Sequence, residues 1–89
     1  MVDVIKRDKR RQKFSRAKLE RSIILAAREA KLTTSRGKQI AEDIADGITK
    51  AISRRRSIKS TELRRKIFSR LEARSKSIIS AWRRYERRI

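Results

Sequence analysis

The sequence of 89 residues contains no cysteine, no histidine and no proline, and it has only two glycines. The absence of cysteine excludes disulfide bonds and thiol chemistry. Without cysteine and histidine the chain also lacks the side chains that hold most transition-metal ions, and it has no imidazole for acid–base catalysis. Because proline and glycine mark turns and linkers, their scarcity indicates a chain made mostly of regular elements.

Motifs for chemistry are missing as well. The sequence has no phosphate loop of the form GxxxxGK[ST], no cluster of metal ligands and no activated nucleophile. We therefore expect no enzymatic activity and no bound metal. No apolar run is long enough to cross a bilayer, and the N-terminus lacks a signal-peptide core, so we expect a cytoplasmic protein that does not act at a membrane.

Positive charge is what the sequence has in excess. It holds 28 Lys and Arg against 10 Asp and Glu, a formal charge of +18. The excess is +6 in residues 1–30 (10 basic, 4 acidic), +1 in residues 31–50 (4 and 3) and +11 in residues 51–89 (14 and 3). Self-repulsion of this size favours a polyanionic partner, with nucleic acid the first candidate and an anionic membrane surface the second.

Apolar residues recur at helical spacing in four segments, at about 16–31, 36–53, 61–73 and 76–88. Four such stripes can share one core, which favours a folded helical domain over a disordered basic tail. The expected core positions are Leu19, Ile23, Ala26, Ala27, Ala30, Ile40, Ile44, Ile48, Ala51, Ile52, Leu63, Ile67, Leu71, Ile78, Trp82, Tyr85 and Ile89.

Serines precede three of these segments. Ser15, Ser35 and Ser60 are the expected N-caps, because a serine hydroxyl accepts a hydrogen bond from a free amide of the first helical turn. A serine in that position can also be a ligand contact, but capping is the more common role.

The opening stretch, MVDVIKRDKRRQKF, does not follow helical spacing. Its apolar residues alternate with polar ones, which predicts a β-hairpin over residues 2–14 that turns at Asp8 and Lys9. Side chains alternate between the two faces of a strand. We therefore expect Phe14 to hold the second strand to the helices, while Arg11 and Lys13 face solvent.

Four motifs together resemble the ATP-cone domain. They are VIKRD (4–8), F-S-x-x-K-L (14–19), IKSTEL (58–63) and AWRRY (81–85). ATP-cones regulate ribonucleotide reductases and form most of a bacterial transcriptional repressor of reductase genes. The resemblance covers residues 3–88. It implies a mainly α fold, an N-terminal β-hairpin followed by four helices, in a single domain of residues 1–89.

The resemblance also implies a pocket for ATP or dATP as a regulatory ligand. The residues that match the family's contacts are Val4, Lys6, Arg7, Lys18, Ser60 and Arg83, or its neighbour Arg84. One departure concerns the hairpin turn, where Lys9 replaces a glycine that is usual in the family. Glycine accepts a positive φ without strain, so this replacement leaves the type of turn open.

The charge exceeds what one triphosphate needs, and we therefore predict a nucleic-acid-binding protein of ATP-cone-like fold. We expect DNA rather than RNA as the partner, with contacts mostly to the phosphate backbone, and a nucleoid-associated architectural or transcription-regulatory role. The residues expected to bind nucleic acid are Lys9, Arg10, Arg11, Lys13, Arg54, Arg55, Arg56, Arg64, Arg65, Arg83, Arg84, Arg87 and Arg88.

Three alternatives stay open. The chain is a stand-alone ATP- or dATP-binding module that controls a partner enzyme, or it is an RNA-binding accessory, for example one associated with the ribosome. In the third alternative the bound nucleotide changes the affinity for DNA. The sequence does not decide among them, and it leaves self-association open.

Overall fold

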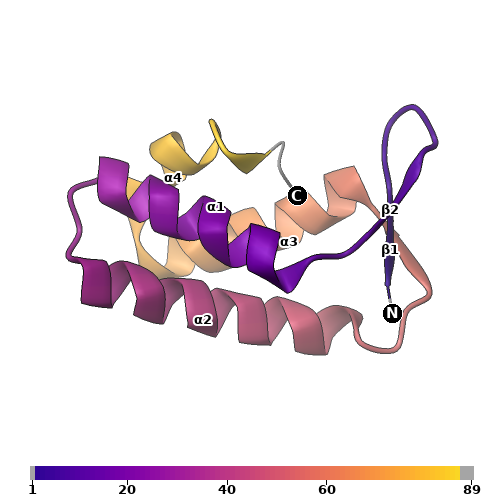
Figure 1. The fold of residues 1–89 in the computed structure, drawn as a ribbon, viewed down its shortest axis with the longest axis horizontal. Coiled ribbons are helices and arrows are strands. Elements are labelled where there is room, and N and C mark those ends of the chain that lie inside the picture. Colours follow the sequence, from indigo (N-terminus) through magenta and orange to yellow (C-terminus); the bar gives the residue numbers. More distant parts are fainter. Residues whose placement is uncertain (1, 87–89) are drawn as a thin grey trace.

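The computed structural model describes residues 2–86, in which a helical bundle carries a small sheet at one end (Figure 1). This confirms the predicted class, mainly α with an N-terminal hairpin. The elements are β1 (Asp3–Ile5), β2 (Arg11–Lys13), α1 (Arg16–Glu29), α2 (Thr34–Ile52), β3 (Ser57–Lys59), α3 (Ser60–Arg74) and α4 (Lys76–Trp82).

The helices pack around one apolar core. Helix α1 packs against α2 and α4, and α3 packs against the same two helices. The predicted stripes supply most of this core, but Ala51 is exposed and Ala30 and Tyr85 are only half-buried, while Ile89 lies outside the described residues. Within residues 2–86, no helix is both long enough and apolar enough to span a bilayer.

Helix starts differ from the prediction at two of three places. Ser15 caps α1 as expected, its Oγ accepting a hydrogen bond from the Lys18 amide at 3.2 Å. Helix α2 begins two residues earlier than predicted, because Thr33 rather than Ser35 is the cap and accepts from the Arg36 amide. Ser60 was also predicted as a cap, but it is the first residue of α3.

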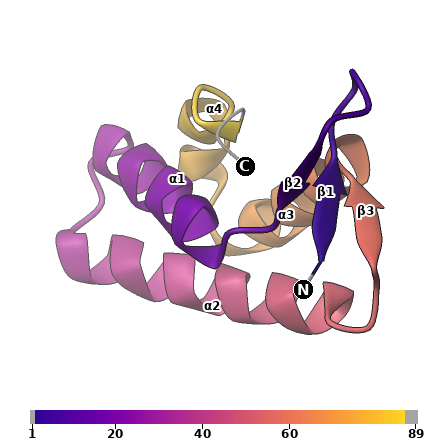
Figure 2. The same cartoon turned by 45° about the vertical axis from the view of Figure 1, so that its right-hand side comes forward.

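The sheet has the strand order β2-β1-β3 (Figure 2). Strands β1 and β2 form the predicted antiparallel hairpin, with Val4 opposite Gln12. Strand β3 was not predicted. It pairs in parallel with β1, with Val4 opposite Ile58, so the hairpin is joined to the chain that leads into α3. The sheet therefore lies where α3 begins.

The hairpin turns through residues 6–10, and Lys9 in this turn has a left-handed backbone conformation. The Lys9 amide donates to the Lys6 carbonyl at 2.9 Å, and Lys9 itself has φ 71°. Lysine thus occupies a conformation that glycine adopts without strain. The predicted face alternation is confirmed, since Arg11 and Lys13 are exposed whereas Phe14 is half-buried and packs against the core.

The last helix is shorter than the predicted 76–88, because α4 ends at Trp82. The Arg84 amide bonds the Ala81 carbonyl and the Tyr85 amide bonds the Trp82 carbonyl, so the chain tightens into shorter turns. Tyr85 and Arg84 both bond Glu29 of α1. The described chain therefore turns toward α1 instead of extending the helix.

Candidate functional site

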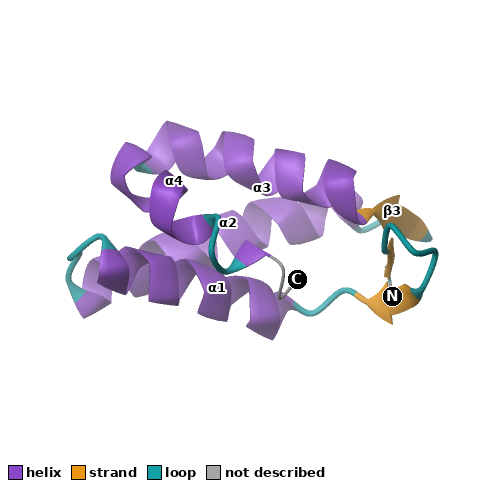
Figure 3. Ribbon diagram, turned by 90° about the horizontal axis from the view of Figure 1, so that it is seen from above, coloured by secondary structure: helices purple, strands orange, loops and turns teal. Residues whose placement is uncertain are grey.

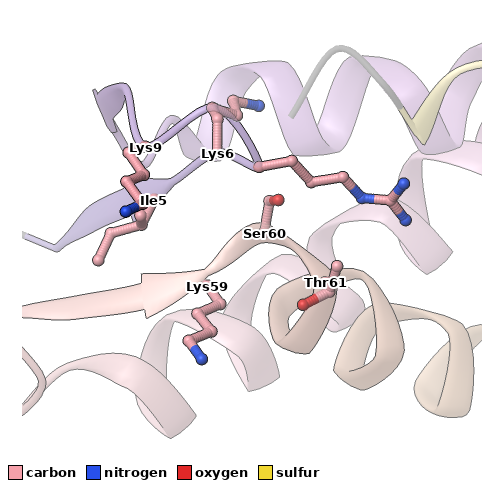
Figure 4. A pocket seen from close by; sticks show the side chains of 7 residues that line it. Ile5, Lys6, Lys9, Lys59, Ser60 and Thr61 are labelled. Atoms are coloured by element: carbon pink, nitrogen blue, oxygen red, sulfur yellow. The ribbon is translucent and has the colours of Figure 1, made fainter.

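The hairpin and the first turn of α3 enclose a cavity of about 340 Å³ (Figure 4). Ile5, on the face of β1 opposite the buried Val4, gives this cavity an apolar wall without joining the core cluster. Strand β3 runs directly into α3, so Lys59, Ser60 and Thr61 form the opposite side. The pocket thus combines an apolar wall with the start of a helix.

The start of α3 has no side-chain cap. Lys59 occupies the N-cap position, and its side chain makes no capping hydrogen bond. Unpaired amides at a helix N-terminus, together with the helix dipole, attract anions. Ser60 is only 3 % exposed and lines the cavity, so this end of the helix borders the cavity.

Four cationic side chains converge beside this helix start. Lys6, Arg7, Arg10 and Arg64 line two adjoining cavities of about 570 and 230 Å³. We call the space formed by these cavities and the 340 Å³ cavity the hairpin cleft. Three of these four cations come from the hairpin loop, and Arg64 comes from one turn into α3, so the fold brings together residues far apart in the chain.

Basic side chains outnumber acidic ones in the lining of the cleft, with six Lys and Arg against Asp8 and Glu86. Partial burial lowers the pKa of the Lys6 ammonium, and the nearby charges of Arg64, Lys18 and Arg10 lower it further, with Asp8 opposing them weakly. The Nε atom of Arg64 is buried and has no hydrogen-bond partner among the residues that the structure describes. Both features indicate a site that an anion would stabilise.

An ion pair engages the acid in the first turn of α3. Glu62, in the first turn, accepts from Arg55 through both carboxylate oxygens, at 2.5 and 3.1 Å. These hydrogen bonds are the main reason that the pKa of Glu62 is lowered. Arg55 also donates to the Ser57 carbonyl at 3.2 Å, so the pair fastens the turn after α2 to the start of α3.

Farther along α3 lies another cavity of about 300 Å³, which we call the Phe68 pocket. Arg83 lies over the ring of Phe68, with its Cζ 5.2 Å from the ring centroid. The other lining residues are Arg7, Thr61, Arg64, Arg65 and Glu86. Because Arg7 and Arg64 line both the hairpin cleft and this pocket, the two sites are continuous.

The residues predicted to bind a nucleotide are only partly brought together. Lys6, Arg7 and Ser60 line the hairpin cleft, and Arg83 lies in the Phe68 pocket. Lys18 is exposed and does not line the cleft. Val4 was predicted as a contact, but it is 2 % exposed in the core. Strand parity explains this difference, because Ile5 faces outward where Val4 faces inward.

Two of the four converging cations were not predicted as nucleotide contacts. Arg10 was assigned to nucleic acid alone, and so was Arg64. A sequence signal for Arg64 exists, since residues four apart share a helix face and Arg64 follows Ser60 by four. No comparable signal marks Arg10, whose place depends on the geometry of the hairpin loop.

The residues predicted to bind nucleic acid lie mostly at the surface. Those described are exposed apart from Arg64, which is half-buried, and Arg87 and Arg88 lie outside the described residues. Some of them are engaged in ion pairs: Arg10 with Asp8, Arg11 with Asp3, Arg55 with Glu62 and Arg84 with Glu29. These positions allow contact with a polyanion.

In a comparison with protein families, the family model described as the ATP cone domain aligns with residues 2–88. Comparisons with curated proteins and with solved structures give no match. The alignment spans the hairpin, the helix start at Ser60 and the Phe68 pocket, so both sites described above lie within the matched region.

Proposed function

Since this chain belongs to the ATP-cone family, we propose that it is a regulatory module that binds ATP or dATP in the hairpin cleft. The observation that carries this proposal is the convergence of Lys6, Arg7, Arg10 and Arg64 beside the uncapped start of α3. A triphosphate carries negative charge and oxygen acceptors, which suit a group of cationic donors such as these. The proposal involves binding without catalysis.

The cleft offers separate surroundings for the two parts of a nucleotide. The wall formed by Ile5 and the methylene groups of Lys59 suits the flat face of a base, as apolar pockets with few polar groups commonly do. The phosphates would then lie toward Ser60 and Arg64, where amides and guanidinium groups can donate to them.

Nucleotide binding would also change the hairpin. Without an anion, the charges around Lys6 repel one another across the gap between the hairpin loop and α3. A bound triphosphate would replace this repulsion by attraction and hold the loop against the helix. A partner enzyme that contacts the hairpin could sense this difference, which is how binding would become regulation.

Thermal unfolding and calorimetry with ATP, dATP and inorganic tripolyphosphate test this function. At a hundredfold excess over Kd, a specific ligand should stabilise the fold by about 2.7 kcal/mol. Arg64→Gln should remove most of this gain, while Arg70→Gln, which changes an exposed arginine of the same helix outside the hairpin cleft, should keep it. Equal stabilisation by tripolyphosphate would indicate general charge relief and contradict a nucleotide site.

A second candidate function is nucleic-acid binding through the phosphate backbone, with DNA favoured. The formal charge of +18 supports it, because one nucleotide cannot neutralise such an excess. A nucleoid-associated place in the cytoplasm and a role in DNA architecture or transcription would follow. If several phosphates are contacted, the logarithm of the binding constant should fall with log salt by about 0.9 for each of them. Absence of binding to a random duplex at low salt would exclude this candidate.

A further inference from the structure

The Phe68 pocket has a composition that the proposed triphosphate site does not require. It lies past the hairpin cleft along α3, and it joins an aromatic ring, a guanidinium group and a carboxylate in one cavity of about 300 Å³. Phe68 is half-buried: it packs against the core and also lines the cavity. Phosphate binding alone would not need an aromatic side chain or an acid.

Phe68 and Arg83 bring two flat groups together, and we call this pair the platform. The Arg83 guanidinium lies over the ring, 5.2 Å from its centroid, within the range of a cation–π contact. A guanidinium is planar and can stack on a second flat partner with its free face. Aromatic and guanidinium planes are the surfaces on which unpaired nucleic-acid bases stack.

Glu86 supplies a hydrogen-bond acceptor to the same pocket. A carboxylate accepts from the exocyclic amino group of cytosine, and the same group is absent from thymine. Arg7, Arg64 and Arg65 surround the pocket with donors for the phosphates on either side of a base. The pocket thus offers flat groups for stacking on a base, an acceptor for the amino group of the base, and donors for the phosphate backbone.

From this combination we propose that the Phe68 pocket binds an unpaired base of single-stranded nucleic acid, with a preference for bases that carry an exocyclic amino group. The inference rests on the second candidate function and narrows it from nucleic acid to single strands. A duplex keeps its bases stacked and paired, so it cannot place one on the platform. The continuous row of cations from the pocket into the hairpin cleft suits a strand that extends beyond one nucleotide.

The test measures fluorescence anisotropy of the full chain with oligo(dC), oligo(dT), an abasic strand and a duplex, each of about 12 nucleotides or base pairs. Oligo(dC) should bind most tightly, and the abasic strand and the duplex should bind weakly at about 0.15 M salt. Phe68→Leu should weaken oligo(dC) binding about tenfold and leave duplex binding unchanged. Phe14→Leu, a matched change at the other phenylalanine, should leave both unchanged, and circular dichroism would confirm that each variant is folded.

The role of Glu86 is tested by the ratio of the affinities for oligo(dC) and oligo(dT), because removing an acid strengthens the binding of every anion. Glu86→Ala should lower the preference for oligo(dC) over oligo(dT), whereas Glu72→Ala, an exposed acid of α3, should not. Equal binding of oligo(dC), the abasic strand and the duplex would overturn the inference while leaving the second candidate intact. Loss of all binding would overturn both. If dCMP bound in a Phe68-dependent way and a longer strand bound no more tightly, the inference would also be overturned, because the ligand would then be a free nucleotide.

Discussion

The indole Nε1 of Trp82 donates a hydrogen bond to Ser22 Oγ at 3.2 Å, in the interior between α4 and α1. Ser22 in turn donates to the Leu19 carbonyl at 2.7 Å. Both side chains are fully buried, so this chain of hydrogen bonds satisfies the polar atoms of the largest residue in the core. It also fixes how α4 packs on α1.

Ser22→Ala should therefore destabilise the fold by about 1–3 kcal/mol, because it leaves the buried indole N–H without an acceptor. Urea unfolding followed by circular dichroism measures this loss. In a Trp82→Phe background the same serine change should cost less, since no indole N–H remains to be satisfied. Equal cost in both backgrounds would show that the hydrogen bond does not couple the two residues.

The left-handed turn at Lys9 predicts a stabilising substitution. Lys9→Gly should raise the free energy of unfolding by about 0.5–1 kcal/mol, because glycine adopts the φ of 71° without strain. Lys13→Gly removes an equal charge from an extended strand position and should lower stability instead. If both changes acted in the same direction, charge rather than backbone strain would govern the hairpin.

The pair formed by Arg55 and Glu62 predicts a dependence on pH. The bonds from Arg55 lower the pKa of Glu62 in the folded state below its ordinary value of 4.5. Its contribution to stability is thus complete above about pH 4.5 and is lost as the pH falls through the lowered value. Glu62→Gln should lose less stability than wild type over this acid range, whereas Glu72→Gln should follow wild type. Thermal unfolding measured across pH 2–6 checks this difference, because that range extends about two units to either side of the ordinary pKa of a glutamate.

The two glycines of α2 should respond in opposite ways to alanine. A Cβ on Gly37 would lie 3.0 Å from the Ala27 Cβ of α1, so overpacking should outweigh the gain in helix propensity. A Cβ on Gly47 would meet only the Arg70 guanidinium, the movable end of a long side chain. We expect Gly37→Ala to destabilise by about 1 kcal/mol and Gly47→Ala to stabilise by about 0.5 kcal/mol.

Urea unfolding of both alanine variants tests this contrast. The comparison is matched, because the same group is added to the same helix. If Gly37→Ala were the more stabilising of the two, the close approach of α1 and α2 would not limit packing at that position.

The helices and the hairpin could be predicted because their signals are local. Repeated apolar spacing identifies a helix within a few turns, and alternation with a polar turn identifies a hairpin. Strand β3 lacked such a signal, since three residues with one apolar side chain, Ile58, do not form a pattern. Its pairing with β1 depends on how α1 and α2 return the chain to the N-terminus.

The candidate site was predictable in part for the same reason. Lys6, Arg7 and Ser60 follow from motif resemblance, and the structure brings them to one cleft. The inward direction of Val4 and the entry of Arg64 depend on strand parity and helix phase in three dimensions. A shift of one residue reverses the face of a strand, so a motif can name the correct segment and the wrong side chain.

The parallel pairing of β1 with β3 also governs the order in which the protein can assemble during synthesis. Val4 contacts Ile58, 54 positions later in the chain, so the N-terminal strand must wait unpaired on that side until residues 57–59 have left the ribosome. Helices α1 and α2 pack on each other through contacts closer in sequence and can form earlier. The hairpin cleft needs both the hairpin and the start of α3, so it is completed late in synthesis. Ligand binding to nascent chains would therefore report when folding is finished.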